Sequence, residues 1–132
     1  MSGMIAAALA VVAIAVFGRG DGRTMVSPPE AVAEDFVRAL ERGRFPQAHK
    51  YLSAAARRRI STARLAEATE SLEARIGRIE DVKGEKGWMS GDDAEASAVV
   101  KTQRAAGVRL PLRFHREAGE WRVVGIVGLA PP

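Results

Sequence analysis

The feature that most constrains the fold is a change of hydrophobic period along the chain. From Val108 to Glu117 apolar and polar residues alternate strictly, which places Val108, Leu110, Leu112 and Phe114 on one face. A period of two residues is that of a β-strand with one buried side. Earlier segments instead space their apolar residues three and four apart, as an α-helix does. Helices that precede strands, instead of alternating with them, predict an α+β fold with an antiparallel sheet.

The first helix is expected to begin within residues 27–30, Ser-Pro-Pro-Glu. Ser27 is the predicted N-cap and Pro28 the first helical residue, because serine accepts a hydrogen bond from the first turn and proline has no N–H to lose there. Gly43 is expected to end this helix. The residues predicted to face the core are Val32, Ala33, Phe36, Val37 and Leu40.

Three further helices are predicted before the sheet. A short one begins at Phe45 and Pro46, Ser53 caps another over residues 54–60, and Thr62 caps the last, which ends at Gly77. The apolar positions assigned to these helices are Ala48, Tyr51, Leu52, Leu65, Ala68, Leu72 and Ile76.

Strands are predicted at residues 78–86, 94–103, 108–117 and 121–127. Turn residues separate them, Ser-Gly-Asp-Asp at 90–93 and Ala-Gly at 118–119. Pro111 has no N–H to donate to a neighbouring strand, so we expect it at an edge or a bulge. Trp121 is predicted to anchor the last strand in the core.

An uncharged apolar run occupies the N-terminus. Residues 4–17, MIAAALAVVAIAVF, extend to seventeen residues with Ser2, Gly3 and Gly18, near the lower limit for a helix that crosses a membrane. We divide the chain into residues 1–18, a hydrophobic anchor or signal segment, residues 19–26, a linker, and residues 27–132, the folded domain. An uncleaved anchor, a cleaved signal peptide and a buried helix of the domain are the open alternatives.

Two arginines, Arg19 and Arg23, follow the apolar run instead of preceding it. Positive charge tends to stay on the cytoplasmic side, so this distribution taken alone would keep the domain in the cytoplasm. Because only two arginines are involved and Asp21 lies between them, we expect a membrane-anchored domain on the periplasmic side and leave its orientation open.

Several kinds of chemistry lack the residues they need. The chain has no cysteine, which excludes thiol catalysis, thiolate metal sites and disulfides. It also lacks the phosphate-loop, dinucleotide and serine-hydrolase motifs. The two histidines, His49 and His115, lie on different elements with no partner at metal-ligand spacing. We therefore expect neither a metal site nor a cofactor.

Three pieces of sequence, PPEAVAEDFVRALERGRFPQAHKYLS, GDDAEASAVVKT and REAGEWRVVGI, together resemble the nuclear transport factor 2-like superfamily over residues 28–128. The most specific pieces are the Ala-Leu-Glu-x-Gly-x-Phe helix end and the Gly-Glu-Trp-Arg-Val strand. The resemblance is closest to small bacterial envelope domains found behind signal peptides or anchors. It implies a cystatin-like fold, in which a strongly curved antiparallel sheet wraps around the helices, often with a pocket between them and often as a homodimer.

Enzymes of this superfamily carry acid and base groups on the concave sheet face or on the helices that line the pocket. The inward face predicted here has no titratable group, whereas a register shift of one residue would bury Arg109, Arg113, His115 and Arg122 at high cost. We therefore expect no catalytic residue. The candidates for a pocket mouth are Asp35, His49 and Tyr51; the alternative is a partly exposed helix surface with Tyr51 in the core.

Charge is distributed unevenly along the predicted helices. Residues 42–66 hold seven basic residues and no acidic one. Such a surface suits anionic lipid or an acidic protein partner, and two solvated helix faces are the alternative. Nucleic acid is not expected, because aromatic residues do not alternate with the basic ones. The candidate basic surface consists of Arg57, Arg58, Arg59 and Arg64.

The sequence as a whole predicts a membrane-associated, non-catalytic interaction or ligand-holding module of the bacterial cell envelope. The alternative function is a small-molecule enzyme or apolar-ligand binder that uses the pocket between sheet and helices.

Overall fold

The structure is a computed structural model that describes residues 26–126. Four helices come first in this range: α1 (Pro29–Glu41), α2 (Phe45–Lys50), α3 (Ala54–Arg59) and α4 (Thr62–Ile76). Four strands follow: β2 (Ile79–Ser90), β3 (Asp93–Thr102), β4 (Val108–Glu117) and β5 (Glu120–Ile126). They form one antiparallel sheet in the order β2-β3-β4-β5. The predicted α+β fold is confirmed.

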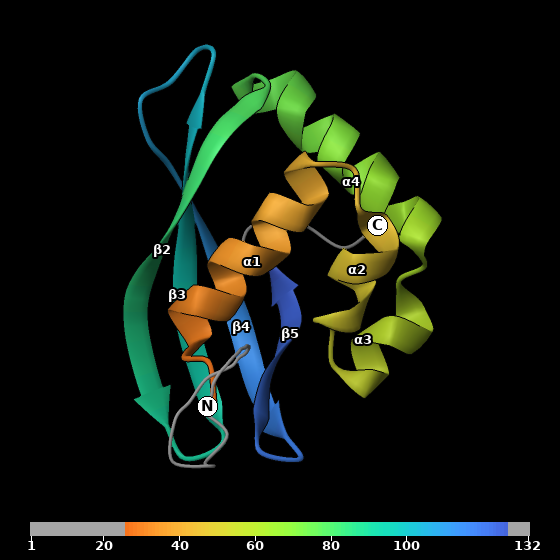
Figure 1. The fold of residues 1–132 in the computed structure, drawn as a ribbon, viewed down its shortest axis with the longest axis vertical. Coiled ribbons are helices and arrows are strands. Elements are labelled where there is room, and N and C mark those ends of the chain that lie inside the picture. Colours follow the sequence, from red (N-terminus) through yellow and green to blue (C-terminus); the bar gives the residue numbers. More distant parts are fainter. Residues whose placement is uncertain (1–25, 127–132) are drawn as a thin grey trace, which may run out of the picture.

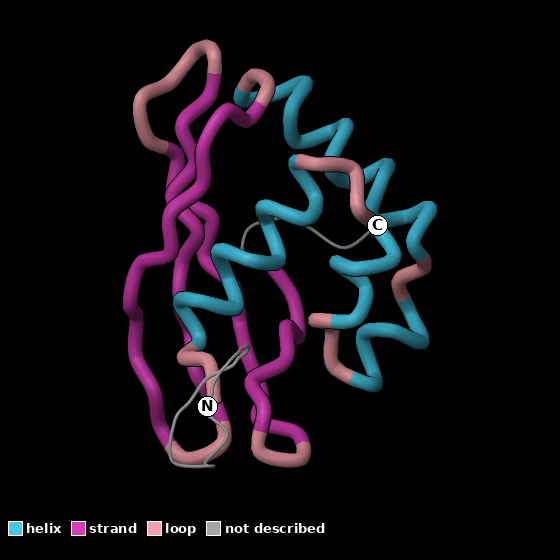
Figure 2. The backbone as a smooth tube through the Cα atoms, viewed as in Figure 1, coloured by secondary structure: helices cyan, strands magenta, loops and turns pink. Residues whose placement is uncertain are grey.

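The helices lie on one side of the sheet (Figures 1 and 2). Helix α1 crosses the sheet over β2 and β3, whereas α3 packs beside β5 and α4 packs against α2 and α1. Shifts of register at two places along β2 mark bulges, and a bulge bends the strand that carries it. Within residues 26–126, no helix is both long and apolar enough to cross a membrane. The predicted anchor, residues 1–18, and nearly all of the linker lie outside the described residues.

The core fills the space between α1 and the inner face of the sheet. On this face, alanines of β3 stand opposite large residues of β4, as in the pairs Ala96–Leu112 and Ala98–Leu110. Small side chains on β3 leave room for α1 to approach closely, and Phe36 of α1 is only 1% exposed. The other buried apolar residues of α1 and β4 include those predicted from their spacing, namely Val32, Ala33, Val37, Leu40, Leu110, Leu112 and Phe114.

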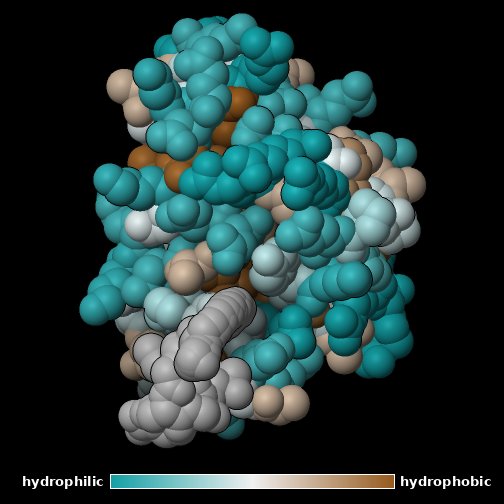
Figure 3. Space-filling model, viewed as in Figure 1, coloured by the Kyte–Doolittle hydropathy of each residue, from teal (hydrophilic) through white to brown (hydrophobic). Residues whose placement is uncertain are grey.

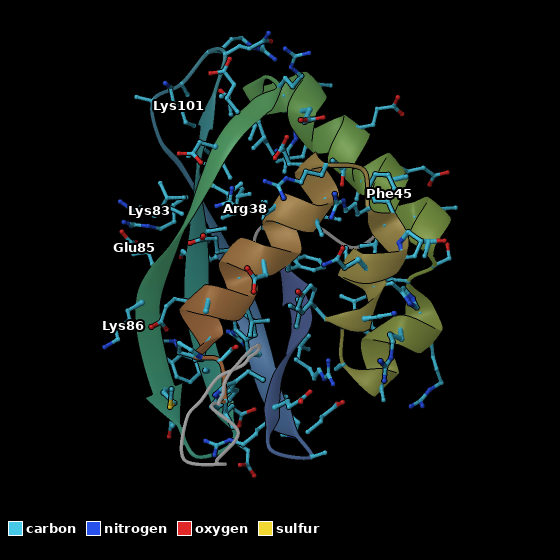
Figure 4. The ribbon with its side chains drawn as sticks, in the orientation of Figure 1. Arg38, Phe45, Lys83, Glu85, Lys86 and Lys101 are labelled. Carbon is cyan, nitrogen blue, oxygen red and sulfur yellow. The ribbon has the colours of Figure 1, made fainter. Side chains whose placement is uncertain are left out.

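Helix α1 closes the free edge of the sheet at β2. The Gly84 N–H donates to Glu34 Oε1 at 2.9 Å, and Arg38 Nη2 donates to the Val82 carbonyl at 2.8 Å. Arg38 also pairs with Glu34 Oε2 at 3.0 Å, and Figure 4 shows Arg38 between α1 and β2. These bonds satisfy backbone groups that an edge strand would otherwise offer to another chain.

The chain between α2 and α3 closes the opposite edge of the sheet. The Val123 N–H donates to the Tyr51 carbonyl at 2.7 Å, and the Ser53 N–H donates to the Val123 carbonyl at 2.8 Å. Leu52 thereby forms a parallel bridge with Val123 of β5. Arg122 Nη1 adds a bond to the Lys50 carbonyl at 2.8 Å. Both edge strands are therefore tied to the helical half of the domain.

Several predictions about helix ends need correction. Ser27 does not cap α1: the N-cap is Pro28, without a side-chain cap bond. Thr62 does not cap α4 either, because Ser61 Oγ accepts from the Arg64 N–H at 3.1 Å and Thr62 is the first helical residue. The predicted cap at Ser53 is confirmed, since its Oγ accepts from the Ala56 N–H at 3.1 Å.

The buried stripe of α4 also differs from the prediction. Ala68 is exposed, and Thr69 takes the buried position beside it. Burial of a hydroxyl is costly unless it is hydrogen-bonded, and Thr69 Oγ1 donates to the Leu65 carbonyl at 2.8 Å. Leu65 and Leu72 are buried as predicted.

The strands lie close to their predicted positions, and two details stand out. β2 continues to Ser90, four residues beyond the predicted end. Pro111 lies in an inner strand, where it pairs with Ser97 of β3, but the described part of β5 ends opposite Leu112. Pro111 therefore has a neighbouring strand on one side only among the described residues, which is where a residue without an N–H fits.

We expect that replacing Gly84 with alanine destabilises the domain. A Cβ atom at this position would lie 2.1 Å from the backbone carbonyl oxygen of Glu30, so Gly84→Ala should push α1 away from β2 and cost about 1–3 kcal/mol of unfolding free energy. Gly125→Ala is the matched control, because nothing lies within 4 Å of its Cβ position. Chemical denaturation measures both variants, and equal stability of the two would contradict the close approach of α1.

The two tryptophans should respond differently to truncation. Trp121 is 6% exposed and packs in the core, whereas Trp88 is 48% exposed. Trp121→Ala should destabilise the domain by about 3–5 kcal/mol, and Trp88→Ala by about 0.5 kcal/mol or less. A Trp121→Ala variant that melts like the wild type would refute the inward register of β5.

Candidate functional site

A hollow of about 220 Å³ lies between α1 and α2. One of its walls comes from positions i, i+3, i+4 and i+7 on one face of α1, and the opposite wall comes from α2 and the residues that flank it. Ala39 is buried there, and its small side chain leaves space for the hollow. The residues that line it are Asp35, Arg38, Ala39, Arg42, Arg44, Gln47 and Tyr51.

Asp35 is a carboxylate without a direct partner. No other residue of the 26–126 range forms a hydrogen bond or ion pair with its side chain. Partial burial raises the pKa of Asp35, the neighbouring charge of Glu34 raises it further, and Arg38 partly offsets both. A carboxylate held in this way can still bind a cation or a hydrogen-bond donor.

The arginines of the hollow differ in how they are used. Arg38 is committed to Glu34 and to the Val82 carbonyl, as described above. The guanidinium groups of Arg42 and Arg44 form no ion pair or hydrogen bond with another described residue. Two free guanidinium groups can donate to a carboxylate or phosphate. As far as residues 26–126 are concerned, the hollow holds one unpaired carboxylate and two unpaired guanidinium groups.

Of the predicted pocket residues, the structure brings two together and separates the third. Asp35 and Tyr51 line the same hollow, whereas His49 does not border it. His49 Nε2 instead lies 2.7 Å from the Ile60 carbonyl, so its ring ties α2 to the end of α3. Arg42, Arg44 and Gln47 were not among the predicted pocket residues.

A second hollow, of about 390 Å³, lies where the start of α1 meets the turn between β4 and β5. Val26, Val32, Tyr51 and Trp121 give it an apolar lining. Two charged residues also border it, Glu120 and Arg122, but they pair with each other at 2.5 Å. Tyr51 lines both this hollow and the one between α1 and α2.

The candidate basic surface lies at the end of α3 and the start of α4. Arg57, Arg58 and Arg59 form the last turn of α3, and Arg64 stands in the first turn of α4. All four side chains are exposed and none is ion-paired with another described residue. The arginines of β4 and β5 behave differently, because Arg109, Arg113, Arg116 and Arg122 each have a carboxylate partner.

The outer face of the sheet carries a third hollow, of about 520 Å³, that includes Trp88, Arg113 and Val124. Beside it His115 Nδ1 lies 3.0 Å from Asp93 Oδ1, and this hydrogen bond raises the pKa of His115. Within the described part of the chain, no three histidine or carboxylate residues cluster as a metal site would require. The face of the molecule that carries α1 is mostly hydrophilic (Figure 3).

The fold is similar to that of a solved structure from Campylobacter jejuni, a protein named "Putative NTF2-like transpeptidase". The TM-score is 0.59 and the sequence identity 16%, over 74% of this chain and 98% of the other. At that identity the likeness concerns the fold alone, and it supports the predicted NTF2-like architecture. No protein-family model matches the sequence, and no curated protein matches it.

Removal of the Asp35 charge should stabilise the domain at neutral pH. Because the pKa of Asp35 is raised in the folded state, the ionised carboxylate costs stability above the pKa of the unfolded chain, about 3.9. Asp35→Asn should therefore melt higher than the wild type at pH 7, and the difference should disappear below about pH 3.5. Thermal unfolding across this pH range measures the effect, and a variant that melts lower at pH 7 would show that the carboxylate has a stabilising partner.

Proposed function

We propose that this chain is a membrane-associated interaction module of the bacterial cell envelope that does not catalyse a reaction. In this proposal its basic surface, Arg57, Arg58, Arg59 and Arg64, contacts anionic lipid. The observation that carries the proposal is that these four exposed arginines are not paired with any described carboxylate. The arginines of β4, in contrast, each have a carboxylate partner.

The distribution of acid and base groups supports a non-catalytic role. General acid–base catalysis needs a positioned group of suitable pKa beside the substrate. The inner face of the sheet presents only apolar side chains from β4 and β5, including Leu110, Leu112 and Phe114. In the apolar hollow the two charged groups neutralise each other, and His49 is occupied by the Ile60 carbonyl.

Anionic lipid is the partner that best suits the rest of the chain. A membrane segment at residues 1–18 would hold the domain at the bilayer, where each basic residue near an anionic surface contributes about 1 kcal/mol. The basic surface and the apolar segment would then act together, because two weak membrane signals bind more firmly than one. An acidic protein is the other partner with complementary charge.

The apolar hollow favours one alternative function, the binding of an apolar small molecule. Its volume of about 390 Å³ lies within the usual range of ligand pockets, roughly 300–1,000 Å³. Val32, Tyr51 and Trp121 would supply the apolar contacts.

Vesicle binding tests the proposed membrane contact. The full chain should bind vesicles of anionic phospholipid about 100-fold more tightly than its Arg57→Gln, Arg58→Gln, Arg59→Gln triple variant, because three contributions of about 1 kcal/mol are lost. The advantage should shrink as salt rises, since the Debye length falls from about 10 Å at 0.1 M to about 3 Å at 1 M.

A second triple variant controls for net charge. Lys101→Gln, Arg109→Gln and Arg113→Gln remove the same charge from the outer face of the sheet, where all three side chains are exposed. This control should bind anionic vesicles like the wild type. If both triple variants lose affinity equally, the effect is one of net charge and the assignment to α3 is wrong. If neither loses affinity, the basic surface does not contact anionic lipid.

A further inference from the structure

The hollow between α1 and α2 carries opposite charges at separated positions. Asp35 and Arg42 are seven residues apart on one face of α1, which places their backbones about 10.5 Å apart along the helix axis. Arg44, the N-cap residue of α2, lines the same hollow two residues after Arg42 in the sequence. The groups that set the pKa of Asp35 are its own burial, Glu34 and Arg38. Asp35, Arg42 and Arg44 are exposed, and their charged groups have no ion-pair partner within residues 26–126. They line one hollow at separate positions.

The charge of the remaining arginine is already balanced. Arg38 lies 3.0 Å from Glu34, so the free charges of the hollow are one negative and two positive. A simple anion would meet the guanidinium groups but would be repelled by Asp35. A simple cation would meet Asp35 but would be repelled by Arg42 and Arg44. A ligand that carries both charges, one at each end, satisfies all three groups.

Neutral polar groups lie on the α2 side of the hollow. The Gln47 amide can donate and accept hydrogen bonds at once, and the Tyr51 hydroxyl can do the same. Neither side chain is hydrogen-bonded to another residue in the 26–126 range. A peptide group offers one donor and one acceptor, so it is a matching partner for the Gln47 amide.

We propose that this hollow binds a short zwitterion of dipeptide size, with its ammonium group on Asp35 and its carboxylate on Arg42 and Arg44. Two extended residues span about 7 Å, which suits side chains that reach toward each other from backbone positions about 10.5 Å apart. The peptide group between the two ends then faces Gln47. This inference is independent of the proposed membrane contact, because the residues of the hollow are not those of the basic surface.

Glycylglycine is the probe, and its two blocked forms isolate the two ends. Binding is followed by NMR titration of the full chain, through the side-chain signals of Gln47 and of the arginines. Glycylglycine should bind about tenfold more tightly than N-acetylglycylglycine, which lacks the ammonium group. It should also bind about tenfold more tightly than glycylglycine amide, which lacks the carboxylate.

Variants of the protein assign each end of the ligand to its residue. Asp35→Asn should weaken glycylglycine about tenfold and leave N-acetylglycylglycine unweakened, because the contact that acetylation removes is already gone. Arg42→Gln with Arg44→Gln should weaken glycylglycine and the acetylated form alike. Lys101→Gln, on the outer face of the sheet, removes one exposed positive charge outside the hollow, is the control and should change neither.

Two results would overturn the proposal. The first is wild-type protein that shows no saturable binding of glycylglycine, or that binds the acetylated form equally well. The second is an Asp35→Asn variant that loses the same affinity for both ligands. The expected stability of this variant at pH 7 separates a lost contact from a lost fold, and its amide spectrum reports the fold directly.

Discussion

The sheet depends on the helical half of the chain to close its two edges. Glu34 and Arg38 bond to backbone groups of β2, and the segment around Leu52 pairs with Val123 of β5. A four-stranded sheet with free edges offers unpaired N–H and carbonyl groups to any passing strand. Here a helix and a short connection take those positions, and Lys83, Glu85 and Lys86 project from β2 where the helix does not reach (Figure 4). The helices are therefore part of the sheet's hydrogen bonding as well as its cover.

This requirement divides the polar residues of α1 between two tasks. On the side that faces β2, Glu34 and Arg38 pair with each other, and Arg38 bonds to the edge strand. Their charged groups therefore serve to hold α1 against the sheet. Asp35 and Arg42 lie on the side that faces α2 and form no bond to β2. The same separation holds at larger scale: arginines of the strands are paired with carboxylates, whereas those of α3 are not. Both proposed binding sites lie on the helical side of the molecule.

The strands were predicted well because a wrong register would bury charged side chains, at a large cost in free energy. A shift of β4 by one residue would bury Arg109 and Arg113, so its alternation left one solution. The predictions of the cap and of the buried positions of α4 were wrong where two adjacent residues can fill the same role. Ser61 and Thr62 can both cap a helix, and Ala68 and Thr69 both fit the inner side of α4 because the Leu65 carbonyl accepts the threonine hydroxyl.

Only the α1 side of the hollow could be predicted from the sequence. The spacing of Asp35 and Arg42 places them on one face of a helix, but the position of Gln47 depends on how α2 packs against α1 and α4. That packing follows from contacts between distant segments, which no local pattern contains. The contact between His49 and the Ile60 carbonyl could not be predicted for the same reason, since it requires the chain to turn back after α3.

The helices α2 and α3 are six residues each, too short to persist alone in water. The Ser53 cap, the His49–Ile60 contact and the pairing with β5 stabilise them. Ala48, Leu52 and Ala56 also anchor this segment in the core, so an opening that breaks these contacts would release both short helices together. Because Gln47, Tyr51 and the three arginines of α3 all belong to it, one local opening would disrupt both of the proposed binding sites at once. A ligand on either surface would hold the segment closed, so occupancy of one site would favour the other through order alone.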